Sequence, residues 1–421
     1  MTADPANTYD WGYLVATKET LQHLIYFFLR RLFAIFQLIY RQCKENDLIP
    51  SGHARVSAIV YRRKRDPEEI ASTDDFVTIH ESFKPLDFLD SHWAIYCVDR
   101  NYALFVELPQ PTTYYEAKRF PFCYIPFFEE ATRVAYVTID DFVAHCKKLG
   151  ETPQPRTILF TNTARCGSTL MAQMLSLDGV TVCFAEPYVL TNLSYLFCEG
   201  FYTKEFVKRV LPAAVTFLRK DVPTDKICVL KTTSTEIRLV PLFDETVSGL
   251  THMFMCRKNG LTSVERLLLR DKAMRIMLEI YNRSPYISDC LSLRYAGDGD
   301  FIRKLFPRDI LEWSAIVYGA PYSHYLKNKK YYKAIVWYHD VVENGEKTMS
   351  DLFQKIDIPL ECVPQALKRL EYDSQGGTYI SRNRLAGMKV SSPAVIEEHR
   401  ERLEHFAEVM EIPKEMLLGG W

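Results

Sequence analysis

An arginine, a glycine and two hydroxyl residues stand together in the stretch TNTARCGSTLM, residues 161–171, which directly follows the apolar run TILF. A strand that leads through a glycine turn into a helix presents free backbone N–H groups, and these groups bind anions. Gly167 would permit the turn, Arg165 would add a positive charge, and Ser168 and Thr169 would add hydroxyl donors. The stretch therefore predicts a site for a phosphate-like anion, with a simple helix cap as the alternative.

The same stretch lacks the residues that bind nucleoside triphosphates. The usual triphosphate loop is GxxxxGK[ST], and that string occurs nowhere in the chain. Cys166 lies inside the stretch, where we interpret it as a small filling side chain, with a reactive thiol as the alternative. The chain has 11 cysteines, without a CxxC pair or a Cys/His spacing that suits zinc. This pattern is typical of free thiols in a reducing compartment, and it predicts a cytoplasmic protein without a structural metal.

Two further cations follow apolar runs later in the chain. Lys231 ends the run KICVLK, and Arg257 follows the run THMFMC, with Ser263 in the next turn. The carboxyl ends of parallel strands meet at one edge of a sheet, and ligands bind at that edge. We therefore expect Arg165, Lys231 and Arg257 to converge on a multiply charged phosphate compound.

Short apolar runs separated by helical stretches would position these residues. The runs are TILFT, VTVCFA, KICVLK, THMFMC and YKAIVWY. Strands without polar alternation, separated by helices, predict an α/β fold in which a parallel sheet has helices on both faces. We assign residues 156–421 to this domain, because ETPQPR is a plausible linker. Residues 1–150 are predicted to form a smaller α+β region of unknown role, with a hairpin in which DRN joins HWAIYCV to YALFVEL.

The charge of the chain and one apolar segment limit its partners. The formal net charge is −1, which argues against nucleic-acid binding because that needs a basic face. Residues 21–41 are apolar, but Arg30 and Arg31 at the middle would each cost roughly 2.5–3.5 kcal/mol inside a bilayer. The polar residues that recur on one stripe of this segment are His23, Arg30, Gln37 and Arg41. They predict an amphipathic helix that packs on the protein, with peripheral membrane contact as the alternative. No oligomeric state is predicted.

Taken together, the motifs resemble those of the sulfotransferases that use 3′-phosphoadenosine 5′-phosphosulfate (PAPS). ARCGSTLM is similar to the 5′-phosphosulfate loop of that family, LKTTS to its central lysine motif, and CRKNGLTSV to its 3′-phosphate motif. The late stretch KAIVWYHDVVENGEKTMSDLFQKIDIP resembles the strand, acidic turn and helix of the family. The resemblance covers about residues 155–385 and implies a P-loop-like sulfotransferase fold. Residues 1–150 match no family.

The resemblance implies an enzyme that transfers the sulfuryl group of PAPS, without a metal, to a hydroxyl or amine of a small molecule. The donor ligands that it implies are Arg165, Cys166, Gly167, Ser168, Thr169, Arg257 and Ser263. Arg165 and Lys231 would stabilise the charge that develops on the bridging oxygen as the sulfur–oxygen bond breaks. Glu186, which follows the second run in CFAEPYVL, would accept the proton of the acceptor. A carboxylate that serves a helix N-terminus is the alternative for Glu186.

Three stretches are less regular. Thr233 stands where many members of the family have a histidine base, and Glu265 stands where the serine of the 3′-phosphate motif usually lies, two places after Ser263. The stretch YDSQGGTYISRNR, residues 372–384, has the composition of a second anion-binding loop or of an ordinary glycine-rich turn. The residues assigned to this second loop are Ser374, Gly376, Gly377 and Arg382.

Two other functions stay open at this point. A small-molecule kinase of the P-loop type would need ATP and Mg²⁺, and the missing GK[ST] string counts against it. A protein that only binds a nucleotide or a partner, without catalysis, is favoured by the threonine at position 233 and by the displaced serine.

Overall fold

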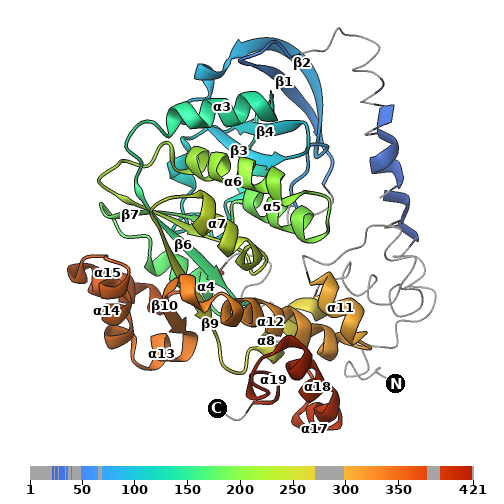
Figure 1. Cartoon of the computed structure of the whole chain (residues 1–421), viewed down its shortest axis with the longest axis vertical. Helices are drawn as coiled ribbons and strands as arrows, with labels where there is room; N and C mark the ends of the chain where they lie inside the picture. Colours follow the sequence, from blue (N-terminus) through green and yellow to red (C-terminus); the bar gives the residue numbers. More distant parts are fainter. Residues whose placement is uncertain are drawn as a thin grey trace.

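The computed structural model describes residues 21–39, except 23, 27, 34, 37 and 38, together with residues 49–64, 69–270, 298–376 and 389–419. Within these ranges the chain forms two five-stranded sheets, one after the other in sequence (Figure 1). Gly377 and Arg382, which were predicted for the second loop, lie outside the described residues. In the described part of the chain, no helix has the length and hydropathy that a membrane crossing needs.

The first sheet is antiparallel and belongs to the N-terminal region. Its strands are β1 (His53–Arg62), β2 (Phe76–Pro85), β3 (Trp93–Val98), β4 (Tyr102–Glu107) and β5 (Arg133–Thr138), in the spatial order β2-β1-β5-β4-β3. The predicted hairpin is confirmed, because β3 pairs with β4. In its turn, the Asp99 carboxylate accepts hydrogen bonds from the backbone N–H groups of Asn101 and Tyr102 at 2.7 Å each. Such a side-chain bond favours the turn over an extended backbone.

The second sheet is parallel and forms the centre of the predicted α/β domain. Its strands are β6 (Arg156–Asn162), β7 (Thr181–Ala185), β8 (Ile227–Lys231), β9 (Leu250–Cys256) and β10 (Tyr332–Trp337), in the order β10-β9-β6-β8-β7. Each predicted apolar run is one of these strands. Leu159 of β6 packs into one hydrophobic core, whereas Ile158 and Phe160 pack into another. Both sides of the strand are therefore buried, which is why the run shows no polar alternation.

Helices cover both faces of the second sheet (Figure 1). On one face lie α5 (Tyr188–Cys198), α6 (Lys204–Arg219), α7 (Val240–Thr246), α8 (Leu261–Arg270) and α12 (Ile310–Lys327). On the other lie α4 (Ser168–Met174), α14 (Gly345–Lys355) and α15 (Val363–Leu367). Further helices are α2 (Tyr124–Glu129), α3 (Ile139–Leu149), α11 (Gly299–Leu305), α13 (Tyr338–Glu343), α17 (Pro393–Glu398), α18 (Arg400–Met410) and α19 (Glu415–Leu418). The fold class predicted from the sequence is confirmed.

The N-terminal region attaches to the edge strand β7 of the second sheet. The N–H of Ala117 donates to the carbonyl oxygen of Cys183 at 2.7 Å, and the N–H of Cys123 donates to that of Ala185 at 2.9 Å. One hydrophobic core also contains residues of both sheets, such as Trp93 of β3 and Phe184 of β7. This attachment brings the segment around Cys123 next to the carboxyl end of β7.

Candidate functional site

The loop between β6 and α4, residues 163–167, is the stretch that the sequence predicts to bind a phosphate, and we call it the phosphate loop. Arg165 and Gly167 both adopt a left-handed backbone, with φ of 57° and 87°. A Cβ on Gly167 would also lie 2.4 Å from the Cδ2 atom of Tyr338. Only glycine avoids both the backbone strain and this clash. Ser168 and Thr169 begin α4 directly after the loop, so their backbone N–H groups lie in the first turn of that helix.

Tyr338 connects the phosphate loop with Arg257. The Arg257 guanidinium carbon lies 4.7 Å from the centroid of the Tyr338 ring, and the same ring lies against Gly167. The hydroxyl of Tyr318 donates to the carbonyl oxygen of Arg257 and so fixes the backbone after β9. Arg165 and Arg257, the two cations that were predicted for opposite ends of the donor, therefore follow adjacent strands, and Tyr338 lies between Arg257 and the loop that carries Arg165.

Lys231 and Glu186 form an ion pair at the carboxyl ends of β8 and β7. The Lys231 side chain is 2% exposed and that of Glu186 is 14% exposed. The backbone N–H of Glu186 donates to the carbonyl oxygen of Lys231 at 2.7 Å, so backbone and side chains join the same two residues. Glu186 has a φ of 58°, a strained backbone of the kind that clusters at functional sites. The N-cap residue of α5 is Pro187, which follows Glu186.

Thr233 belongs to a small buried network beyond Lys231. Its hydroxyl donates to Oε2 of Glu236, and the hydroxyl of Thr191 donates to Oε1, both at 2.5 Å. Glu236 is fully buried, and this burial raises the pKa of its carboxyl. Thr233 is therefore held by a carboxylate that we did not predict. The signal was the glutamate three residues after Thr233 in LKTTSTE.

The 3′-phosphate motif has a mixed outcome. Ser263 lies in the first turn of α8, half-buried, and its N–H donates to the carbonyl oxygen of Gly260 at 3.0 Å. Glu265, at the place of the usual serine, is buried and accepts hydrogen bonds from the N–H and the hydroxyl of Ser391. Glu265 thus anchors the C-terminal segment, whereas a role for Ser263 as a ligand stays a prediction.

The start of the predicted second loop reaches the phosphate loop through Gln375. The Arg165 Nη1 donates to Oε1 of Gln375 at 3.0 Å, and Nε2 of Gln375 donates to the Thr169 hydroxyl at 3.2 Å. The carbonyl oxygen of Ser374 accepts from Nε2 of Gln173 at 3.1 Å, and Gly376 is exposed in the same turn. The two predicted loops therefore meet, but the residue that joins them was not among those we selected from the sequence.

No family model matches the chain, and no curated protein matches it. Similar solved structures include a sulfotransferase from Alicyclobacillus acidocaldarius, at 12% identity and a TM-score of 0.36, covering 62% of this chain and 98% of that one. They also include the sulfotransferase domain from the curacin biosynthetic pathway, at 13% identity and a TM-score of 0.35, covering 62% of this chain and 99% of that one. A third is sulfotransferase STF9 from Mycobacterium avium, at 9% identity and a TM-score of 0.36, covering 65% of this chain and 82% of that one.

All three are sulfotransferases. The motif resemblance led us to expect neighbours of this kind.

Cys166 is buried, as its interpretation as a small filling side chain predicts. Its side chain is fully buried beneath the phosphate loop, and burial raises the pKa of its thiol. A buried thiol with a raised pKa is a poor nucleophile. Cys166 therefore acts as a filling side chain of the loop, while its backbone N–H remains part of the predicted anion site.

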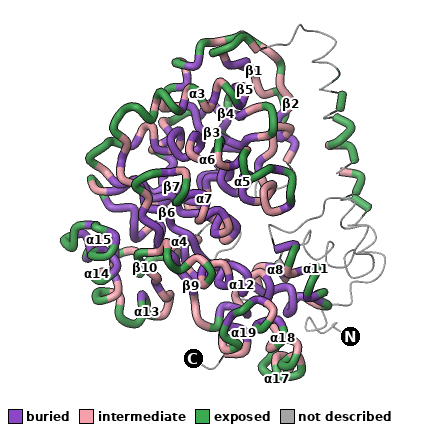
Figure 2. The backbone as a smooth tube through the Cα atoms, in the orientation of Figure 1, coloured by how far each residue is buried: buried purple, intermediate pink, exposed green. Residues whose placement is uncertain are grey.

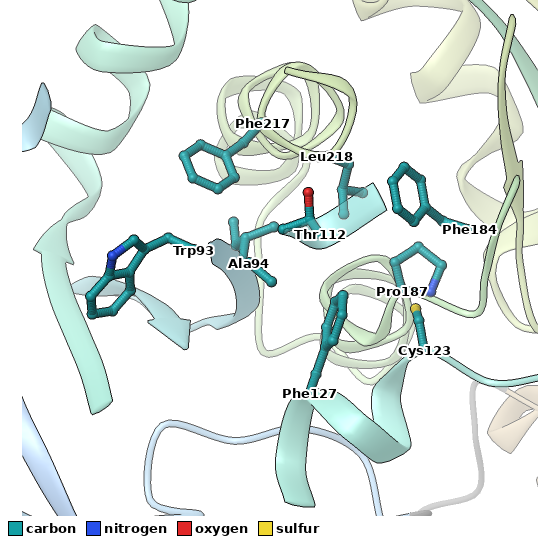
Figure 3. A pocket seen from close by; sticks show the side chains of 10 residues that line it. Trp93, Ala94, Thr112, Cys123, Phe127, Phe184, Pro187, Phe217 and Leu218 are labelled. Carbon is teal, nitrogen blue, oxygen red and sulfur yellow. The ribbon is translucent and has the colours of Figure 1, made fainter. Parts of the chain in front are cut away.

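A small cavity lies between the two sheets, beside Pro187 (Figure 3). Phe127 and Trp93 of the N-terminal region and Phe184 and Phe217 of the second domain line it, and Pro187 borders it. Its volume is about 10 Å³, which is room for about one water molecule. The cavity is a packing gap and not the place of a nucleotide or an acceptor. In the described ranges, no three His, Cys, Asp or Glu side chains are grouped to hold a metal ion.

Proposed function

We propose that this protein is a PAPS-dependent sulfotransferase that acts on a hydroxyl or amine of a small molecule. One observation carries the proposal. Arg165, Lys231 and Arg257 follow three strands that are neighbours in the parallel sheet, and a carboxylate, Glu186, contacts the central lysine. A polyanionic donor needs such convergent cations, and proton transfer from an acceptor needs such a carboxylate.

In this proposal the phosphate loop and Arg257 hold the two ends of the donor. Arg165, the hydroxyls of Ser168 and Thr169, and the loop N–H groups, including those of Cys166 and Gly167, donate to the 5′-phosphosulfate. Arg257 donates to the 3′-phosphate, with Ser263 as an additional donor. Tyr338 lies against both parts and sets the distance between them. Ser374 and Gly376, with Gly377 and Arg382, remain candidates for further contacts.

The transfer step needs a group that stabilises the leaving oxygen and a group that accepts a proton. The acceptor oxygen or nitrogen bonds to sulfur as the bond from sulfur to the bridging oxygen breaks. The electron pair of the broken bond stays on the 5′-phosphate. Lys231 and Arg165 donate to that oxygen, and preorganised donors of this kind are worth about 2.7–4 kcal/mol each.

Glu186 accepts the proton of the acceptor. Before the donor binds, Glu186 is paired with Lys231. The bridging oxygen then competes with the carboxylate for the lysine ammonium. The proposal uses no metal ion.

Incubation of the purified protein with ³⁵S-labelled PAPS and a metabolite extract tests the proposal. We expect labelled products that are absent when Lys231→Ala protein is used. Thermal shift should show stabilisation by adenosine 3′,5′-bisphosphate and none by ATP with Mg²⁺. Stabilisation by ATP with Mg²⁺ alone would instead identify a kinase. We also propose a reducing compartment such as the cytoplasm, which is supported by nine free cysteines in the described part of the chain.

A non-catalytic nucleotide-binding protein is the second candidate, and one observation favours it. Thr233 and the buried Glu236 close the place where many family members have a histidine. In that case adenosine 3′,5′-bisphosphate would still stabilise the protein, but no acceptor would become labelled.

A further inference from the structure

The helical segment at residues 21–39 turns an apolar side outward. Its exposed large side chains are Leu21, Leu24, Ile25, Phe28, Leu29, Leu32, Phe33, Ile35, Phe36 and Ile39. They range from 36% exposed at Leu24 to 66% at Phe28. The segment stands beside the first sheet, and its described residues are mostly exposed (Figure 2). Elsewhere in the described chain, exposed large apolar residues do not gather on one helix in this number.

The opposite side of the segment is polar and is bound to the loop between β1 and β2. The hydroxyl of Tyr26 donates to the carbonyl oxygen of Arg63. One turn later, Arg30 donates to Oε2 of Glu69 at 2.8 Å and to Oδ1 of Asp75 at 2.6 Å. Asp75 is fully buried. If the helix rolled to bury its apolar side, Asp75 would lose one of its cations inside the protein, which is costly. The ion pairs therefore keep the apolar side facing outward.

The width of the apolar stripe suits a fluid surface better than a second helix. At about 100° per residue, the exposed side chains cover roughly half of the helix circumference. A seam between two paired helices is narrower, because only two positions in each heptad meet the partner. The stripe also consists of Leu, Ile and Phe alone, whereas protein interfaces centre on Trp, Tyr and Arg. Lipid chains need breadth and apolar area without such directional contacts.

The charge of the segment complements an anionic surface. Between Thr20 and Lys44 the sequence contains no Asp or Glu, and its charged residues are arginines. Arg31 is exposed, and the helical spacing places it at the border of the apolar stripe. A cation in this position lies at the level of lipid phosphates when the neighbouring side chains enter the acyl region.

We propose that residues 21–39 dock this protein onto the surface of a bilayer that contains anionic lipid. The apolar stripe inserts into the leaflet that the protein contacts, and the polar side stays bound to the acidic residues around Asp75. The helix thus lies between the membrane and the first sheet. This proposal does not depend on the sulfotransferase activity.

Co-sedimentation of the full chain with vesicles tests the proposal. The vesicles consist of phosphatidylcholine alone, or of phosphatidylcholine with about one third phosphatidylserine. We expect binding to the anionic vesicles that salt weakens without abolishing. The Phe28→Ser, Phe33→Ser double variant should partition at least about tenfold less. The matched control is Leu360→Ser, because Leu360 is 53% exposed but lies far along the chain in a 3₁₀ turn; it should bind like the wild type.

Three outcomes would overturn the proposal. The first is a wild-type chain that ignores both kinds of vesicle. The second is a dimer that forms without lipid and that the double substitution dissociates, because the stripe would then pack against a second copy of the chain. The third is retention in membranes after carbonate extraction, because the helix would then span the bilayer. Equal far-UV circular dichroism and thermal unfolding of the variants exclude a folding defect as the cause of lost binding.

Discussion

Lys231 and Glu186 contact each other twice, through the ion pair of their side chains and through a backbone hydrogen bond of 2.7 Å. The lysine that should stabilise the leaving oxygen is therefore the partner of the carboxylate that should accept the proton. In the proposed reaction, the leaving oxygen of the donor would therefore compete with Glu186 for Lys231.

Replacing the proposed base should separate catalysis from donor binding. Glu186→Gln keeps the shape and a hydrogen-bond acceptor for Lys231 but cannot take a proton. We expect kcat to fall by roughly 10²-fold or more, with PAPS affinity equal or slightly higher because a negative charge is removed. Turnover with ³⁵S-PAPS and calorimetric titration measure the two quantities. Glu361→Gln, at an exposed residue, is the control and should change neither.

Near-normal turnover of the Gln variant would rule Glu186 out as the base. His252 would be a poor replacement, because it lies inside β9, well before the carboxyl end of the strand. His339 follows β10 and is half-buried near Arg257, so it would be the next residue to replace.

Arg257 should discriminate between donors with and without a 3′-phosphate. We expect Arg257→Ala to weaken the binding of adenosine 3′,5′-bisphosphate by about 10- to 100-fold, since a charge-assisted contact is lost. Adenosine 5′-phosphosulfate, which has no 3′-phosphate, should bind almost unchanged. Lys258→Ala is the matched control, because it removes the same charge from the next residue and Lys258 lies over Trp337 instead. An equal loss for both ligands would show that Arg257 does not contact the 3′-phosphate.

Gln375 should compete with the donor. Its amide engages Arg165 and Thr169, two of the groups proposed for the 5′-phosphosulfate. Gln375→Ala should therefore tighten the binding of adenosine 3′,5′-bisphosphate by about 3- to 10-fold, which is the equivalent of one ordinary hydrogen bond. Gln365→Ala, which removes an exposed amide that bonds to Asp178, should have no effect. Weaker binding of the Gln375 variant would mean that the amide positions Arg165 instead of competing with the ligand.

His252 should make the fold sensitive to acid. Burial lowers the pKa of His252 from 6.5 to about 4, and its ring nitrogens have no hydrogen-bond partner in the described chain. Because the folded pKa lies below the unfolded pKa, the stabilising contribution is complete above about pH 6.5. It is lost as the pH falls toward 4.

The His252→Leu variant should therefore lose less stability than the wild type between pH 7 and pH 5, by about 1–2 kcal/mol in urea unfolding. Some sensitivity should remain, because burial also lowers the pKa of His324, to about 3. Parallel stability curves for variant and wild type would contradict the assignment.

The strands and the positions of the cations could be predicted because both depend on local sequence. A run such as KICVLK is buried on both faces, and its last residue must lie at the carboxyl edge of a parallel sheet. Lys231 and Arg257 are placed in this way. The glycine of the phosphate loop was also predictable, since a sharp turn before a helix leaves few alternatives.

The contacts between distant segments could not be predicted in the same way. Glu186 contacts Lys231 because β7 lies next to β8. The sequence of a single strand does not determine which strands are its neighbours in the sheet. Gln375 reaches Arg165 across 210 residues, and an amide carries no charge that would mark it in the sequence. The role of Glu265 was hidden for the same reason, because its partner Ser391 lies 126 residues away.

The two hydrogen bonds from Ala117 and Cys123 to β7 have a consequence for how the chain can be divided. They occupy backbone acceptors of an edge strand, and open edges invite pairing with other chains. A fragment that starts at residue 156 would expose this edge and also the core surface that Trp93 covers. Such a fragment should aggregate when it is expressed alone. The first sheet thus serves the second as a cover for β7, and separating the two would require another cover.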